Sequence, residues 1–196
     1  MSKLIVQSFT PKVGNIITLE SGNSFLNLPA QPFLQSNSVR TETQTTYSAP
    51  ASGNGTTIAA LNVSITPTST DSMLWMKWML SGEIGQDCVF LIHRNGNLIT
   101  DTGYEAYNAT VGNQRYSGVV SGWYDNNNDS TQANWCIHHF VRANSTEPLT
   151  FSPAVRASSS TALTFYLNKT VGSYEITVSS GAIYELANNT YTYSLK

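Results

Sequence analysis

The most regular hydrophobic pattern in the chain lies between residues 61 and 99. Leu61, Val63 and Ile65 alternate with polar residues, which is the two-residue period of a half-buried strand. A turn rich in Pro, Ser and Thr follows, and the next apolar run covers residues 73–80. This succession of short strands and turns predicts the core of a β-sandwich.

A hairpin is predicted near the end of this stretch. Residues 88–92 are largely apolar and precede the pair Asn95-Gly96. Asn and Gly both accept the positive φ that the central positions of a type I′ turn require, so this pair beside apolar strands is a strong hairpin signal. We therefore expect adjacent antiparallel strands on either side of it.

The run at residues 73–80 is apolar on both faces if it forms a strand. One face carries Met73, Trp75 and Met79, and the other carries Leu74, Met76, Trp78 and Leu80. Such a strand is typical of the centre of a sheet that is covered on both sides. The second cover is either part of a thick monomeric core or another subunit. In the latter case the oligomer interface contains Trp75, Trp78 and Met79.

Strand signals continue toward the C-terminus. Trp135, Ile137, His139 and Val141 alternate with Cys136, His138 and Phe140. Further strands are predicted at residues 115–121, 149–157, 162–167, 174–178, 182–186 and 190–195. No stretch combines a sustained helical period with caps, so the predicted fold class is all-β, with antiparallel strands.

The first 40 residues differ from the rest of the chain. They contain short β-type runs separated by Pro and Gly, and we interpret residues 29–40 as a linker. Runs this short gain order by pairing with identical chains or with a neighbouring protein. The sequence thus predicts an extended segment at residues 1–40 and a sandwich domain at residues 41–196. The apolar positions of the segment are Leu4, Val6, Phe9, Ile16 and Leu19.

Composition narrows the possible partners. Charged residues make up 11% of the chain, against about 25% in a typical soluble domain. The few Lys and Arg residues are scattered, so nucleic acid is not an expected partner. Lys77 interrupts the longest apolar run, and no membrane insertion is expected. The N-terminal residues lack the apolar segment of a secretory signal, so we expect no export by that route.

Cysteine and histidine are the residue types that could hold a metal. Cys88 and Cys136 lie in predicted strands and are expected to be buried, reduced thiols, with a disulfide as the alternative. His138 and His139 point to opposite faces of a strand and cannot reach one ion together with His93. We predict no metal and no cofactor, although a ring of histidines around a threefold axis is an alternative.

A polar loop near residue 125 is the candidate ligand site. Asp125, Asn127 and Asp129 are spaced like the start of a calcium loop, but Ser130 and Cys136 stand where an EF-hand needs Gly and Glu. A solvated surface loop is therefore predicted. Neighbouring aromatic rings could stack on the apolar face of a sugar, so the candidate glycan patch consists of Trp123, Tyr124, Asp125, Asn127 and Asp129.

Catalytic patterns are not evident in the sequence. There is no G-x-S-x-G motif, no glycine-rich phosphate loop and no pair of carboxylates in a catalytic spacing. General acid–base or nucleophilic chemistry needs such a set of groups. Glu83 and Asp87 are interpreted as turn residues. We expect that the protein is not an enzyme.

Several stretches follow one another in a recognisable order. They are LNVSITPTSTDSMLWMKWML, CVFLIHRNGNLI, and HHFVRANSTEPLTFSPAVRASSSTALTFYLN followed by GAIYELA. With the N-terminal MSKLIVQSFTPKVGNIITLESGN, they resemble small fibre or knob proteins on the virions of tailed bacteriophages, particularly those of marine and cyanobacterial hosts. The aromatic tail after Ala187 and the central strand rich in Trp and Met depart from that pattern.

The resemblance implies a jelly-roll-like knob, commonly homotrimeric, that the N-terminal segment anchors to the virion. The expected partners are identical chains, other virion proteins and host-surface glycans, and the expected location is the virion. Two alternatives stay open. One is a capsid decoration or head-fibre protein that binds the shell without a receptor role, and the other is a glycan-degrading tail enzyme.

Overall fold

The computed structural model describes residues 33–99, 118–122 and 131–187. These residues form an all-β domain of two antiparallel sheets, which confirms the predicted fold class and is consistent with a β-sandwich. The apolar positions of the N-terminal segment, Leu4, Val6, Phe9, Ile16 and Leu19, lie outside the described residues, as does the predicted strand at 190–195.

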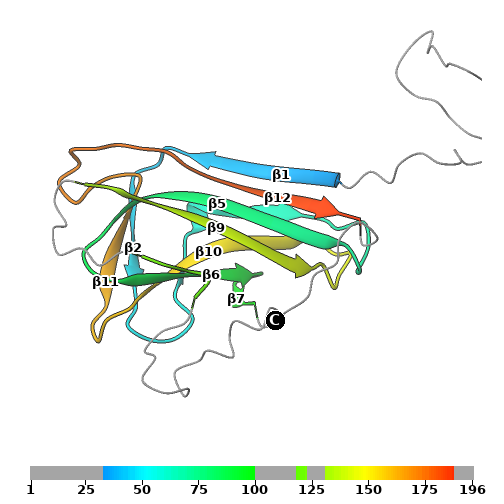
Figure 1. Ribbon diagram of the computed structural model, residues 1–196, viewed down its shortest axis with the longest axis horizontal. Helices are drawn as coiled ribbons and strands as arrows, with labels where there is room; N and C mark the ends of the chain where they lie inside the picture. Colours follow the sequence, from blue (N-terminus) through cyan, green and yellow to red (C-terminus); the bar gives the residue numbers. More distant parts are fainter. Residues whose placement is uncertain (1–32, 100–117, 123–130, 188–196) are drawn as a thin grey trace, which may run out of the picture. The chain divides into compact units, whose positions relative to one another are not determined.

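Sheet A contains the longest strands. Its members are β1 (Phe33–Thr41), β2 (Thr45–Ala49), β5 (Met73–Ile84), β9 (Ala133–Arg142), β11 (Leu163–Leu167) and β12 (Ser179–Leu186). β5 lies in the centre. One of its edges pairs with β9, and the other pairs first with β12 and, further along β5, with β11. Figure 1 shows β1, β12, β5 and β9 side by side. The prediction that residues 73–80 form a central strand is confirmed.

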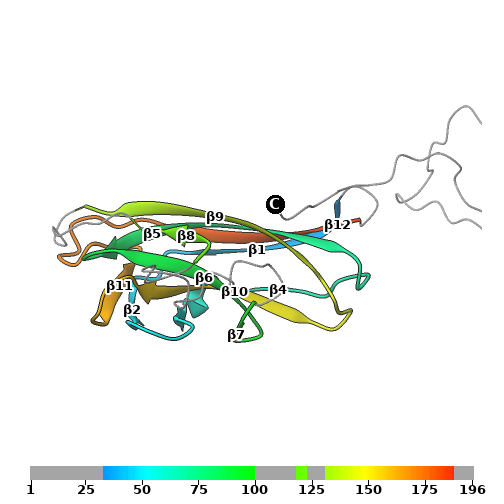
Figure 2. The same cartoon turned by 60° about the horizontal axis from the view of Figure 1, so that its bottom comes forward.

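Sheet B lies against the inner side of sheet A. Its members are β3 (Thr56–Thr57), β4 (Val63–Ile65), β6 (Cys88–Arg94), β7 (Asn97–Leu98), β8 (Val120–Ser121) and β10 (Leu149–Ala157). β10 pairs with β6 on one edge and with β4 and β3 on the other. A short 3₁₀ turn, Ala59–Leu61, precedes β4. Figure 2 shows the two layers, with β4, β6 and β10 below β5 and β12.

The core fills the space between the sheets. Its largest fully buried side chains include Trp78, Phe90, Phe151 and Phe165. Leu74, Met76, Trp78 and Leu80, which the sequence pattern places together on one face, all point inward from β5. Trp135, Ile137 and Val141 do the same from β9. Alternation of side chains separates the two faces of each strand, but it does not show which face of β5 points inward, because both faces are apolar.

The predicted hairpin is confirmed at Asn95-Gly96. β6 and β7 pair on either side of the turn, and φ is 51° at Asn95 and 80° at Gly96. Positive φ at both central residues is the signature of a type I′ turn. A Cβ built on Gly96 would meet no atom within 4 Å. A side chain at this position would therefore lower stability through the backbone conformation that it disfavours, and not through a clash with neighbouring residues.

Gly96→Ala should lower the free energy of unfolding by about 1 kcal/mol, because an L-residue with a Cβ is disfavoured in the left-handed region. Urea denaturation of the two chains measures this difference. Equal midpoints would show that the left-handed turn is not required at this position.

The prediction that residues 29–40 form a linker is partly wrong. Residues 33–40 belong to β1, which pairs with β12 over its whole length. The side chains of Gln35 and Asn37 donate hydrogen bonds to the carbonyl oxygens of Thr66 (2.6 Å) and Ser64 (2.8 Å). These polar side chains connect an edge of sheet A to the segment of β4, so the strand lacks the apolar alternation by which strands are recognised.

The predicted strand at residues 174–178 is also wrong. Only Ile176 makes a bridge, an isolated one to Lys169. Tyr174 and Ile176 are 78% and 62% exposed. Their apolar side chains do not face the core, so their alternation carried no information about a sheet.

Candidate functional site

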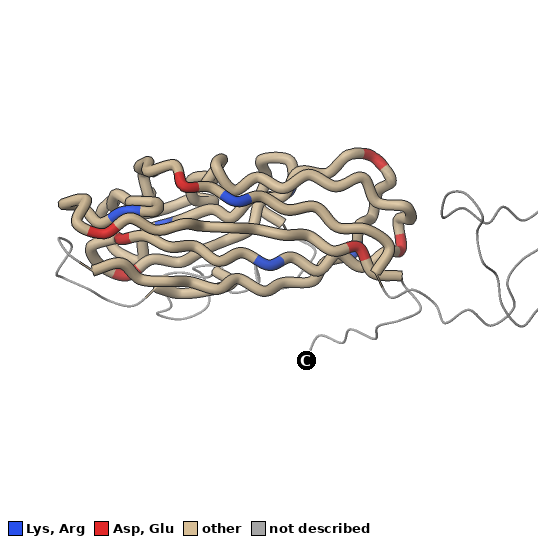
Figure 3. Tube along the Cα trace, turned by 90° about the horizontal axis from the view of Figure 1, so that it is seen from above, with Lys and Arg blue, Asp and Glu red and all other residues tan. Residues whose placement is uncertain are grey.

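The broadest functional candidate is the surface of β1, β12, β5 and β9 that points away from the core, here called the outer face of sheet A. Strand register aligns the side chains at the centre of this face in three rows. The rows are Ser36–Tyr184–Trp75–Phe140, Ser38–Ala182–Lys77–His138 and Arg40–Ser180–Met79–Cys136. Figure 3 shows this side of the domain, where charged residues occur singly along long uncharged strands.

Aromatic rings form the first row. The Trp75 and Phe140 rings are stacked, with centroids 5.8 Å apart and planes inclined by 6°. Tyr184 lies 5.2 Å from Trp75 on the other side, and Phe33 meets Tyr184 edge-on at 5.9 Å. Cross-strand aromatic pairs of this kind stabilise a sheet. The rings of Tyr184, Trp75 and Phe140 therefore pack against one another across three neighbouring strands.

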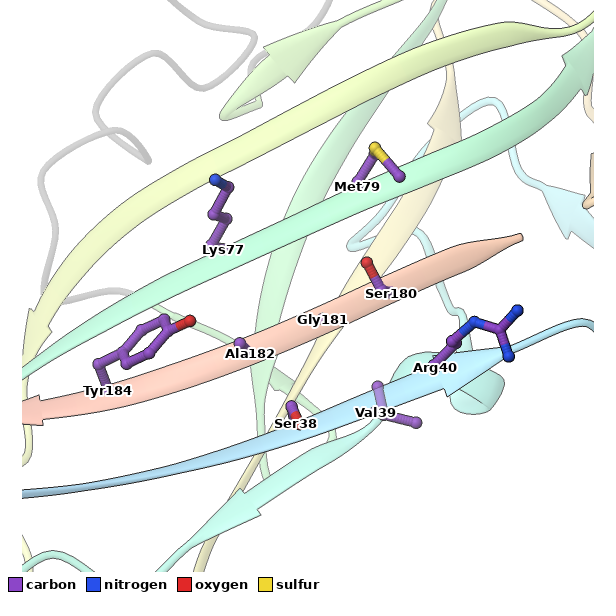
Figure 4. A pocket seen from close by; sticks show the side chains of 9 residues that line it. All are labelled: Ser38, Val39, Arg40, Lys77, Met79, Ser180, Gly181, Ala182 and Tyr184. Atoms are coloured by element: carbon purple, nitrogen blue, oxygen red, sulfur yellow. The ribbon is translucent and has the colours of Figure 1, made fainter. Parts of the chain in front are cut away.

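A hollow of about 320 Å³ adjoins this row. Its lining residues are Ser38, Val39, Arg40, Lys77, Met79, Ser180, Gly181, Ala182 and Tyr184. Figure 4 shows Lys77 and Met79 on β5 beside Ser180, Ala182 and Tyr184 on β12, with Arg40 near the end of β1. The small side chains on β12 leave the space, and the longer ones on either side border it.

The charged side chains that line the hollow are both cationic. Its lining includes Arg40 and Lys77, and none of the described lining residues carries a carboxylate. Arg40 pairs with Glu42 at 2.7 Å, but both side chains are 65% exposed, and such surface pairs contribute little. Lys77 forms no ion pair within the described part of the chain. Serine and tyrosine hydroxyls supply the other polar groups.

The predicted oligomer interface is wrong in one of its residues. Trp78 is fully buried, and its indole nitrogen donates a hydrogen bond to the carbonyl of Leu61 at 3.1 Å. Trp75 is half-buried among the aromatic row, whereas Met79 is 47% exposed. Trp78 alternates with Trp75 and Met79 along β5 and so points into the sandwich.

The histidines are separated, as the strand geometry predicted. His138 is exposed and His139 is half-buried on the opposite side of β9. His93 is buried in β6, where Nε2 lies 2.8 Å from the Asn54 carbonyl oxygen and Nδ1 lies 2.7 Å from the Thr57 hydroxyl. Because a carbonyl only accepts, Nε2 carries the proton. Among the described residues, no three His, Cys, Asp or Glu side chains are grouped as a metal site.

The two cysteines are free, but only one is buried. Burial raises the pKa of the Cys88 thiol to about 12, so this side chain stays protonated and unreactive. The prediction that Cys136 is buried is wrong, because it points outward from β9 between two inward residues, Trp135 and Ile137. Alternation on this strand places it on the outer face of sheet A.

A buried carboxylate lies under the other side of β12. Glu185 is fully buried. Its oxygens accept hydrogen bonds from the Gln35 amide at 2.6 Å and from the Thr68 backbone and hydroxyl, each at 2.7 Å. Burial acts to raise the pKa of this carboxyl, but hydrogen bonds from Ser72, Thr68 and Gln35 outweigh it and lower the pKa. The carboxylate thus fastens β1 and residues 66–72 to β12.

The glycan patch predicted from the sequence, Trp123, Tyr124, Asp125, Asn127 and Asp129, lies outside the described residues. Sequence reasoning missed the hollow on sheet A. Its only signal was the run of small residues Ser179, Ser180, Gly181 and Ala182 before Tyr184. Such a run in a strand leaves room on the sheet surface.

Comparison with known proteins gives no assignment. No protein-family model matches the chain, and no curated protein matches it at a significant level. Within the described ranges, no helix has the length and apolar character needed to cross a bilayer.

Proposed function

We propose that this chain is a structural protein of a bacteriophage virion surface, a short homotrimeric fibre or knob. In this proposal the N-terminal segment around Leu4–Leu19 anchors the protein to other virion proteins. The sandwich is displayed outward and attaches the particle to the host surface. The role is one of binding, without catalysis, metal or cofactor.

The strand order of the two sheets carries this proposal. Along the chain, β1, β5, β9 and β12 alternate with strands of sheet B, and they lie side by side in the order β1-β12-β5-β9. In sheet B, β4 and β6 pair with opposite edges of β10, and β7 and β8 both pair with the other edge of β6. This order is the one expected of a jelly roll, a double-sheet fold common in viral capsid and lectin domains.

Composition gives further support. The chain contains 12 acidic and 10 basic residues, so its surface consists mostly of neutral polar and apolar groups. The outer face of sheet A is an example, with hydroxyls, aromatic rings and isolated cations. A neutral, hydroxyl-rich β-surface suits contact with saccharides, and repeated copies on a particle would multiply weak contacts by avidity.

An antibody raised against the purified chain tests the proposal on particles of the phage that encodes it. We expect the antibody to label intact virions in electron micrographs and to block their adsorption to host cells. An unrelated antibody of the same class is the control. Virions without label would contradict the proposal.

The same experiment separates attachment from decoration. Label on the capsid shell with undiminished adsorption would support the decoration protein and would contradict the attachment role. Label on the tail tip with blocked adsorption would support the attachment role.

A further inference from the structure

We infer that the hollow on the outer face of sheet A binds an acidic saccharide, such as a uronate-bearing or sulfated glycan chain. This inference rests on the proposed attachment function, because it names the ligand class and the surface that would contact it. The hollow is bordered by Lys77, Tyr184, Ser180 and Met79, and none of its described lining residues is acidic.

The positive charge of the lining side chains favours a negatively charged ligand. Lys77 projects from the central strand between Ala182 on β12 and His138 on β9, and its side chain is exposed. It has no ion-pair partner within the described ranges. Arg40 borders the same hollow and forms an exposed pair with Glu42, so Lys77 is the cation that an anion meets without a competing carboxylate. Ammonium and guanidinium groups pair readily with carboxylate or sulfate.

The remaining lining groups favour a sugar over a simple anion. Hydroxyls of Ser38, Ser180 and Tyr184 can donate and accept hydrogen bonds, and Figure 4 shows the Tyr184 hydroxyl directed toward Ala182. Met79 is 47% exposed and provides an apolar surface for the C–H face of a pyranose. A volume of about 320 Å³ is at the small end of ligand sites. It therefore suits one or two units of a chain that continues across the open face.

The same face of a second copy fits this surface less well. The three rows of the outer face carry Lys77 in the middle and no carboxylate. A copy docked on the same rows would bury an ammonium group without a partner from the equivalent face, which is costly. An acidic saccharide neutralises Lys77 and leaves its other groups solvated.

Affinity electrophoresis of the full chain tests the inference, with polygalacturonate, dextran sulfate or uncharged dextran in the gel. We expect retardation by at least one of the two anionic polymers and none by dextran. The polymer that retards the chain identifies the acidic group as carboxylate or sulfate. Lys77→Gln should weaken the retardation roughly tenfold, the usual loss for one charge-assisted hydrogen bond.

Lys169→Gln is the matched control, because it removes the same charge from a lysine that lies over the Tyr166 ring and outside the hollow. It should leave retardation unchanged. Ala182→Glu is a second test, since it places a carboxylate opposite Lys77 and should abolish retardation. Circular dichroism melts of each variant check that the fold is retained.

Three results would overturn the inference: no retardation by either anionic polymer, equal retardation of Lys77→Gln and Lys169→Gln, or equal retardation by dextran. Equal loss in the two lysine variants would indicate a general attraction to negative charge. The antibody labelling of virions does not depend on Lys77, so failure at this site leaves the attachment proposal to be decided by its own test.

Discussion

Trp78→Ala should lower the free energy of unfolding by about 3–5 kcal/mol, the usual cost of removing a large aromatic side chain from a core. Trp78 is fully buried and lies at the centre of β5. The substitution also removes the donor to the Leu61 carbonyl, so that carbonyl loses a partner in the interior. Urea denaturation followed by tryptophan fluorescence and circular dichroism measures the loss.

Met79→Ala is the matched control, because Met79 is the next outward-facing residue of the same strand and is 47% exposed. Met79→Ala should lower the free energy of unfolding much less than Trp78→Ala does, since an exposed side chain buries less apolar area on folding. Similar losses for both variants would contradict the assignment of Trp78 to the core.

Gly181 provides an independent test of how tightly Trp78 is held. Gly181 is the cross-strand partner of Trp78, and a Cβ at this position would lie 2.2 Å from Cδ1 and 2.3 Å from Nε1 of the indole. Gly181→Ala should therefore be destabilising by itself. In the double variant with Trp78→Leu, Gly181→Ala should cause little further loss of unfolding free energy. The effects of substitutions at residues in contact are not additive. A fully additive double variant would contradict the contact.

Glu185→Gln should lower the free energy of unfolding at pH 7 by about 2–3 kcal/mol, because hydrogen bonds to a charged acceptor are worth more than neutral ones. The carboxylate accepts bonds from Gln35 and Thr68 in the folded chain, and an amide can satisfy only part of this set of donors. Glu147→Gln, at an exposed position, is the control and should be nearly neutral.

The pH dependence of the same carboxylate follows from the direction of its pKa. Its folded pKa is lower than the ordinary value of 4.5, so the unfolded chain binds the proton more readily. The contribution of Glu185 is complete above about pH 4.5 and is lost as the pH falls toward the folded pKa. The stability difference between the native chain and Glu185→Gln should therefore shrink on acidification. A constant difference from pH 7 to pH 3 would contradict this role.

The sequence predicts the strands correctly where the pattern of buried residues follows the two-residue period of a strand. Alternation separates the two faces of β5 and β9 and predicts the limits of β10, and turn chemistry predicts the Asn95-Gly96 turn. These features are local, and each is recorded in a few neighbouring residues. The prediction of two antiparallel sheets depends only on such features.

The remaining features depend on long-range packing. β1 is polar because its side chains hydrogen-bond to residues 64 and 66 across the sandwich edge. Glu83, interpreted from sequence as a turn residue, is buried in β5 and accepts a hydrogen bond from the Val171 backbone at 2.7 Å. Neither partner is close in sequence, so no local pattern indicates the contact.

The hollow on sheet A illustrates the same limit for function. Its lining comes from β1, β5 and β12, which are distant in the sequence and become neighbours through strand pairing. Sequence placed the ligand site in an aromatic, Asn-rich loop because those residue types are adjacent there. On the sheet, residues as distant as Arg40 and Tyr184 are brought together instead.

Light scattering of the full chain in solution tests the central claim of a trimeric knob most directly. We expect a mass of three times the 21.4 kDa of one chain, independent of protein concentration in the micromolar range. A variant beginning at Gln31, the start of the compact unit that contains the sandwich, shows in parallel whether the sandwich alone holds the trimer. A mass of 21.4 kDa for the full chain would contradict the trimeric knob.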